Sequence, residues 1–161
     1  MTKKEYNACV DSYADGLYRF ILSSIKDSEK AKDLVQDAFE RLWQKHEEVS
    51  GQKAKSYLFT VGYHAMIDLV RKDQRTEPLT DSTAISISHA NQFSDLNEVL
   101  HNAIEKLPDV QKMVVLLRDY EGYSYAEIAN ITSLTEAQVK VYIYRARQFL
   151  REYIGSINAV I

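Results

Sequence analysis

The strongest constraint on the fold is a pair of helix-start signatures that lie close together. Ser124-Tyr-Ala-Glu127 and Thr135-Glu-Ala-Gln138 both fit the capping box. In this motif a hydroxyl accepts a bond from a first-turn backbone N–H, and the side chain three residues on returns one. The two boxes begin 11 positions apart. This spacing leaves room for a short helix, a tight turn and a second helix, so we predict a helix-turn-helix over residues 124–151.

The apolar pattern of this segment agrees with the prediction. In the second helix, apolar residues recur at i, i+4, i+7 and i+11, which gives the helix one buried stripe. The stripe consists of Val139, Ile143, Ala146 and Leu150. Ile128 and Ile131 mark the first helix, Leu134 falls in the turn, and the small Ala129 allows the two helices to approach closely.

Positive charge is concentrated in the second helix. Between residues 140 and 151 there are four Lys and Arg residues and no Asp or Glu. Recognition helices place N-terminal residues at base edges while basic neighbours grip phosphates. We therefore expect DNA contacts here, with a solvated helical hairpin as the plain alternative. The candidate DNA-binding residues are Thr135, Gln138, Lys140, Val141, Tyr144, Arg145 and Arg147.

Composition favours an all-α fold. The 161 residues suffice for one medium domain or two small ones, and only five Gly and two Pro argue for long helices. The net charge of −3 is awkward for a DNA-binding protein, unless a partner supplies most of the affinity.

Targeting and cofactor signals are absent from the sequence. Cys9 is the only cysteine, which excludes an internal disulfide, and we expect it to be a packed thiol. The four histidines lack metal-ligand spacing, so no metal and no cofactor are expected. The polar N-terminus lacks a signal-peptide core, and no apolar stretch is long enough for a membrane span. We expect a cytoplasmic protein without membrane insertion.

The chain divides at a polar stretch. Helical periodicity predicts three helices before it, at about 3–24, from 28 onward, and at about 56–73, with a polar loop at 48–55. Asp27 and Ser28 can cap the second helix. Its apolar residues Leu34, Phe39, Leu42 and Trp43 are expected in the core. Helices resume at Leu96, Pro108 suits the first turn of the next helix, and Gly122 can close it.

We therefore predict two small helical domains joined by a flexible linker. The first covers residues 1–75, the linker covers 76–94, and the second covers 95–161. Ser, Thr, Asp, Asn and Pro78 dominate the linker, which is long for a loop inside a compact domain.

Several segments together resemble the extracytoplasmic-function (ECF) group of bacterial RNA polymerase sigma factors. Four segments are similar to sigma domain 4, namely Leu107-Pro108, residues 117–129, Val139-Lys140 and Arg145-Ala146-Arg147. Residues 33–43 and 57–72 are similar to sigma domain 2. The resemblance implies a transcription initiation factor that is not itself an enzyme. Such a factor binds core RNA polymerase and directs it to promoters, and it is often held by an anti-sigma factor.

The resemblance also implies a division of labour among the residues. Domain 4 would read the −35 element. In domain 2, the polar face of the second helix would bind core polymerase through Asp33, Gln36, Asp37, Glu40 and Arg41. The loop at residues 49–56 would help to read and melt the −10 element, with one base flipped out into a pocket. The −10 candidates are Ser50, Gln52, Lys53, Tyr57, His64, Arg71, Lys72 and Arg75.

Three departures from the family pattern bear on specificity. His64 stands where Asn is common, so it could contact a base or simply pack. Ser133 occupies a turn position where Gly is common. Val141 and Tyr142 replace a common Ser and Arg, so the −35 preference of relatives cannot be transferred.

Two other classes of protein remain as alternatives. A two-domain transcriptional regulator could use the same helix-turn-helix on its own operator, usually as a dimer on a palindrome. The acidic balance and the pattern at residues 33–43 argue against it. A helical enzyme is disfavoured because the sequence contains no Gly-rich phosphate loop and no nucleophile–base signature.

Overall fold

The computed structural model describes the backbone of residues 1–76 and 96–160, and every regular element in these ranges is helical. This confirms the all-α prediction. The elements are α1 (Lys3–Ile25), α2 (Ser28–Gln44), α3 (Gly51–Thr76), α4 (Leu96–Glu105), α5 (Asp109–Val115), the π-helical turn η1 (Leu116–Tyr120), α6 (Tyr125–Thr132) and α7 (Glu136–Val160). The predicted linker, apart from Thr76, lies outside the described residues.

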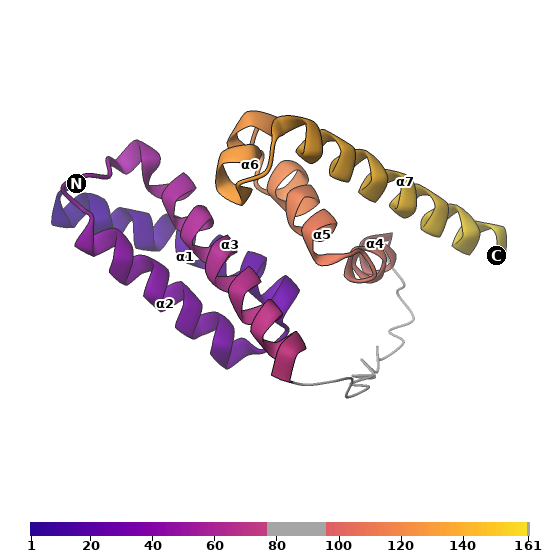
Figure 1. Ribbon diagram of the computed structural model, residues 1–161, viewed down its shortest axis with the longest axis horizontal. Helices are drawn as coiled ribbons and strands as arrows, with labels where there is room; N and C mark the ends of the chain where they lie inside the picture. The colour runs from indigo at the N-terminus through magenta and orange to yellow at the C-terminus, as the bar shows by residue number, and fades with distance from the viewer. Residues whose placement is uncertain (77–95, 161) are drawn as a thin grey trace.

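Helices α1, α2 and α3 pack against one another and form the N-terminal bundle (Figure 1). Apolar residues at helical spacing fill its centre, among them Leu17, Ile21, Leu42 and Leu58, all fully buried. At Gly62 the helices α1 and α3 approach closely. A Cβ there would lie 2.9 Å from Leu17 Cδ1 and 3.3 Å from Ile21 Cδ1, so an alanine would force these buried side chains to shift.

The C-terminal bundle consists of α4, α5, η1, α6 and α7. α7 packs against α4, α5 and α6, and its predicted stripe from Val139 to Leu150 is buried. Gly122 has a φ of +77° after η1, a conformation that favours glycine. It ends the helical run as predicted and turns the chain toward α6.

Two expectations about the N-terminal bundle are wrong. The segment predicted as a loop at 48–55 is helical from Gly51, where Lys53 N donates to Ser50 O at 3.0 Å. Trp43 is 40% exposed rather than buried. Its ring stacks on His46 and meets Tyr6 edge-on, at centroid distances of 4.3 and 5.0 Å. Trp43 thus lies over the end of α2 and not inside the bundle, whereas Phe39 and Leu42 are buried as expected.

The two bundles lie against each other (Figure 1). α3 packs against α6, and α1 packs against α5. Within the described ranges, no helix is long and apolar enough to cross a bilayer.

Candidate nucleic-acid interface

Both predicted capping boxes are present at the helix-turn-helix. Glu127 N donates to Ser124 Oγ at 3.1 Å, and Ser124 N donates to Glu127 Oε1 at 3.0 Å. At the second box, Gln138 N donates to Thr135 Oγ1 at 3.1 Å, and Thr135 N donates to Gln138 Oε1 at 2.9 Å. Four backbone N–H groups that would otherwise need water are satisfied by side-chain oxygens, which fixes where α6 and α7 begin.

The turn between these helices adopts a left-handed conformation at Ser133. Its φ is 60° and its ψ is 28°, a region that non-glycine residues visit at a cost. Ser133 thus adopts a left-handed conformation that glycine would adopt without a steric cost, which is why glycine suits this turn. The capping boxes on either side hold the turn in place.

The face of α7 opposite the buried stripe is open to solvent. All the residues predicted there from sequence are exposed. They are Thr135, Gln138, Lys140, Val141, Tyr144, Arg145 and Arg147. Tyr144 and Val141 are 68% and 44% exposed, so this face offers apolar contacts beside its positive charges. Such side chains can contact thymine methyl groups in the major groove.

The basic residues of this face differ in whether an acidic side chain pairs with them. Arg147 Nη2 donates to Asp119 Oδ1 at 2.7 Å, and this bond raises the pKa of the Arg147 guanidinium. Lys140 forms a looser ion pair with Glu136 at 3.8 Å. Arg145 is exposed and has no ion-pair partner among the described residues. Arg145 is therefore the most available cation for a phosphate or a guanine edge.

The sequence did not single out Asp119, which ties α7 to η1. Nor did it single out Tyr120, whose side chain is 63% exposed on the same turn. The available sequence signal was the acidic–aromatic pair at the end of the predicted helix, just before Gly122.

On α2, the polar residues predicted to bind a protein partner are all exposed. They are Asp33, Gln36, Asp37, Glu40 and Arg41. Spaced at i, i+3, i+4, i+7 and i+8, they share one face of the helix. The exposed indole of Trp43 follows them, so a mixed acidic, basic and aromatic surface is present.

The residues predicted to read a second DNA element are spread along α3. Ser50, Gln52 and Lys53 are exposed at its start, and Arg71 and Lys72 are exposed near its end. Tyr57 and His64 are partly buried. The side chain of Arg75 lies outside the described residues. His64 Nε2 lies 3.4 Å from Ser133 Oγ, so this side chain contacts the helix-turn-helix of the other bundle.

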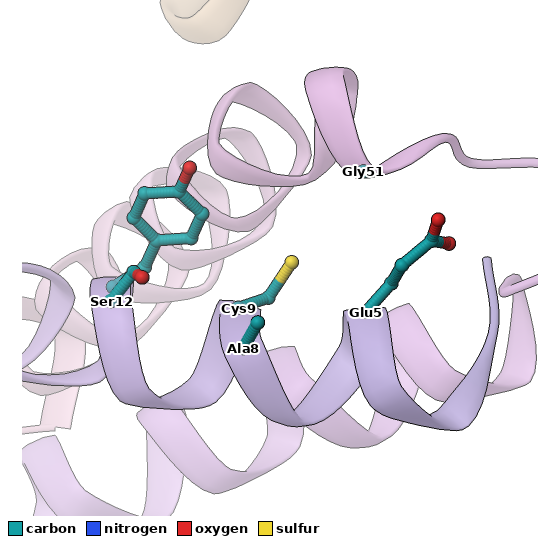
Figure 2. A pocket seen from close by; sticks show the side chains of 6 residues that line it. Glu5, Ala8, Cys9, Ser12 and Gly51 are labelled. Atoms are coloured by element: carbon teal, nitrogen blue, oxygen red, sulfur yellow. The ribbon is translucent and has the colours of Figure 1, made fainter.

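A hollow of about 230 Å³ lies between α1 and the start of α3 (Figure 2). Its lining consists of Glu5, Ala8, Cys9, Ser12, Tyr13 and Gly51. Burial and the charge of Glu5 raise the pKa of the Cys9 thiol, so this group stays neutral. Cys9 is buried, as the sequence predicted. Within the described part of the chain, no cluster of three or more His, Cys, Asp or Glu could hold a metal ion.

Comparisons with known proteins place both bundles in one family. Residues 9–76 match the sigma-70 region 2 family, and residues 97–150 match the sigma-70 region 4 family. The chain is 33% identical to the ECF RNA polymerase sigma factor SigM of Bacillus subtilis (strain 168) over 145 residues, 86% of this chain and 88% of that protein. It is 28% identical to the RNA polymerase sigma factor SigV of the same organism, over 93% of this chain and 91% of that protein.

A solved structure agrees with the sequence relatives. The sigma factor RpoE of Bartonella quintana, in complex with the anti-sigma factor NepR, matches with a TM-score of 0.74 at 26% identity. The match covers 94% of this chain and 98% of that chain.

Proposed function

The chain belongs to the ECF RNA polymerase sigma factors, and on that premise we propose how its surfaces divide the work of promoter recognition. Residues 1–75 form a domain that binds core RNA polymerase and opens the −10 element. Residues 95–161 form a domain that reads the −35 element, and residues 76–94 link the two. The polymerase catalyses RNA synthesis, and this chain determines which promoters the polymerase uses.

The observation that carries the −35 assignment is the open face of α7. It is exposed, basic and partly apolar, and it lies opposite a buried stripe on a helix whose start is fixed by the Thr135–Gln138 capping box. This is the arrangement that a recognition helix needs for entry into a major groove. Arg145 and Lys140 are the proposed phosphate or base contacts, and Val141 and Tyr144 are the proposed apolar ones.

For the −10 element, the start of α3 is the proposed reader. Ser50, Gln52 and Lys53 are exposed there, and the hollow beside Gly51 is the proposed receptacle for a flipped base. Permanganate oxidation of unpaired thymines in the polymerase–promoter complex measures this melting step. Unreactive thymines in a transcribing complex would contradict the −10 role.

The polar face of α2 is the proposed contact with core polymerase. An anti-sigma factor is a second proposed partner, because the structurally similar RpoE was solved with one bound. Association with polymerase also accounts for the net charge of −3, since DNA affinity need not come from this chain alone.

Single-residue variants separate the two surfaces. Asp37→Ala and Arg41→Ala should weaken binding to sigma-free core polymerase by about 1–2 kcal/mol, or about five- to thirtyfold, as interface truncations do. At saturating polymerase they should leave promoter binding by the assembled complex unchanged. Fluorescence anisotropy with labelled protein measures both affinities.

Lys140→Ala and Arg145→Ala should show the opposite pattern. Core affinity should stay intact, while promoter affinity of the assembled complex should fall and its salt dependence should become shallower by about one ion per residue. Loss of core affinity in these variants would contradict the proposed division.

A further inference from the structure

The outward side of α7 carries a second apolar stripe, on a helix that runs along the outside of the C-terminal bundle (Figure 1). Ala137, Val141 and Tyr144 recur at i, i+4 and i+7, so they share one face of the helix, and all three are exposed. At about 100° per residue, this face points directly away from the buried Val139 and Ile143. Apolar side chains therefore gather on the part of α7 that lies farthest from the core.

Cationic side chains flank this outward stripe on both sides. Lys140 and Arg147 lie on one flank, and Arg145 lies on the other. An α-helix with its side chains is about 10–12 Å across, and the major groove of DNA is about 12 Å wide. A helix that fills the groove has phosphates on either side and base edges in front of it. The flanking cations of α7 thus face the phosphates, and the outward stripe faces the bases.

The polar side chains near the start of α7 already have partners within the chain. Thr135 and Gln138 complete the capping box. Lys140 Nζ lies 3.8 Å from Glu136 Oε1 and 5.7 Å from the centre of the Tyr125 ring on α6. The side chains best suited to hydrogen bonds with bases are therefore engaged, and the outward stripe is what this end of the helix presents to a ligand.

Val141 is the central residue of the outward stripe. It lies in the second turn of α7, and recognition helices contact base edges with their N-terminal residues. Its side chain is 44% exposed. Valine has one strongly preferred side-chain conformation in a helix, so its two methyl groups are held in a fixed position. They offer neither a hydrogen-bond donor nor an acceptor.

The major groove contains one apolar group that can match such a side chain. Thymine presents its 5-methyl group there, whereas the other base edges present hydrogen-bond donors and acceptors. Against valine these polar groups would lose water without gaining a partner, which costs free energy. A valine held between two rows of phosphates therefore favours thymine over the other bases.

We propose that Val141 contacts the 5-methyl group of a thymine in the −35 element and thereby selects this base. The inference rests on the proposed function and deepens it, because it names the base that the recognition helix prefers at one position. The flanking cations position α7 on the duplex, and Val141 adds the preference. Serine, which is common at this position in the family, can bond to donors and acceptors alike and would not impose it.

Replacement of single thymines by deoxyuridine tests the contact, because uracil pairs as thymine does but lacks the 5-methyl group. The probe is a promoter recovered by transcription of genomic DNA, bound by core polymerase and the full chain at one fixed salt concentration. One substitution in the −35 element, on either strand, should weaken promoter binding about fourfold, as the loss of one buried methyl group predicts. The same substitution should leave the affinity of the Val141→Ala complex unchanged.

Gln148→Ala is the matched control, since Gln148 is exposed and lies seven residues beyond Val141 on the same face. This variant should keep the fourfold effect of uracil. Alanine is a better helix former than valine, so Val141→Ala should retain α7, and urea denaturation checks this. In a library with a randomised −35 region, the wild type should enrich thymine at one position. Val141→Ser should lose that enrichment and keep the others.

Three results would overturn the inference, each in a different way. If no thymine replacement weakens the wild-type complex, α7 does not read a methyl group. An equal loss in the wild type and in Val141→Ala would assign the methyl contact to another side chain. If the wild type forms no promoter complex with core polymerase at all, the proposed function itself fails, and the inference fails with it.

Discussion

At the scale of single residues, Tyr123 makes a direct prediction about stability. Its side chain is 6% exposed, and its hydroxyl has no hydrogen-bond partner among the described residues. Burial chiefly, and then the neighbouring Glu121, raise the pKa of this hydroxyl, so it remains protonated. A buried polar group without a partner costs about 1–3 kcal/mol.

Removing that hydroxyl should therefore not weaken the protein. Tyr123→Phe keeps the ring against Phe59 and is expected to raise the free energy of unfolding by about 1 kcal/mol. Urea denaturation followed by circular dichroism measures the change. A clear loss of stability would show that the hydroxyl has a hydrogen-bond partner after all.

Two arginines that look equivalent in sequence should behave differently. Arg147 is held by Asp119, whereas Arg145 has no such partner in the described part of the chain. Arg145→Ala should therefore reduce promoter affinity more than Arg147→Ala. Arg147→Ala should instead lower the free energy of unfolding by about 0.2–1 kcal/mol, as exposed pairs do. Equal losses of promoter affinity would contradict this ranking.

Residue-level exposure was only partly predictable. The stripe from Val139 to Leu150 is buried because its period matches the helix. Trp43 has the same periodic position as its buried neighbours, yet it is exposed. Its ring packs against Tyr6 and His46 at the end of α2 and not inside the bundle. The Arg147–Asp119 bond spans 28 positions, so no local pattern could predict it.

At the scale of elements, the start of α6 depends on the ionisation of one carboxylate. Bonds from the Ser124 backbone and hydroxyl hold the pKa of Glu127 below its usual 4.5. A carboxyl with a lowered pKa in the folded state stabilises that state above the unfolded pKa. This stabilisation is lost as pH falls through the folded-state value.

Glu127→Gln should reveal that contribution. The amide can still bond the Ser124 N–H, but it lacks the negative charge that favours a helix N-terminus, so the variant should be about 0.3–1 kcal/mol less stable at pH 7 and low salt. As the pH falls below 4.5, the difference from the wild type should shrink. Denaturation of both proteins at each pH measures it, and a difference that is constant with pH would argue against a charge effect.

Helix starts were predictable where a side-chain cap marks them. Asp27 caps α2 through the Glu29 and Lys30 N–H groups, and the two boxes of the helix-turn-helix lie where the sequence placed them. The start of α3 was not predictable, because Ser50 and Gly51 are as typical of loops as of helix ends. The π-helical turn at Leu116–Tyr120 likewise has no local signature in the sequence.

At the scale of the whole molecule, the sequence predicts two helical units but not how they meet. The bonds that join them connect residues 66 and 89 positions apart, Lys55 with Glu121 and Lys112 with Ser23. Lys112 falls among the apolar residues of α5, and only the folded arrangement shows what its charge meets. The net charge of −3 is also compatible with a role on DNA at this scale, since polymerase rather than this chain alone would hold the DNA.

The central claim is that this chain gives core RNA polymerase its promoter specificity. The most direct measurement is transcription by sigma-free core polymerase on fragmented genomic DNA of the source organism, with and without the purified protein. The account predicts discrete transcripts that depend on the protein, with shared motifs near −10 and −35 upstream of their starts. Tight, specific DNA binding by the free protein, with no complex with core and no added transcripts, would contradict the account and favour an operator-binding regulator.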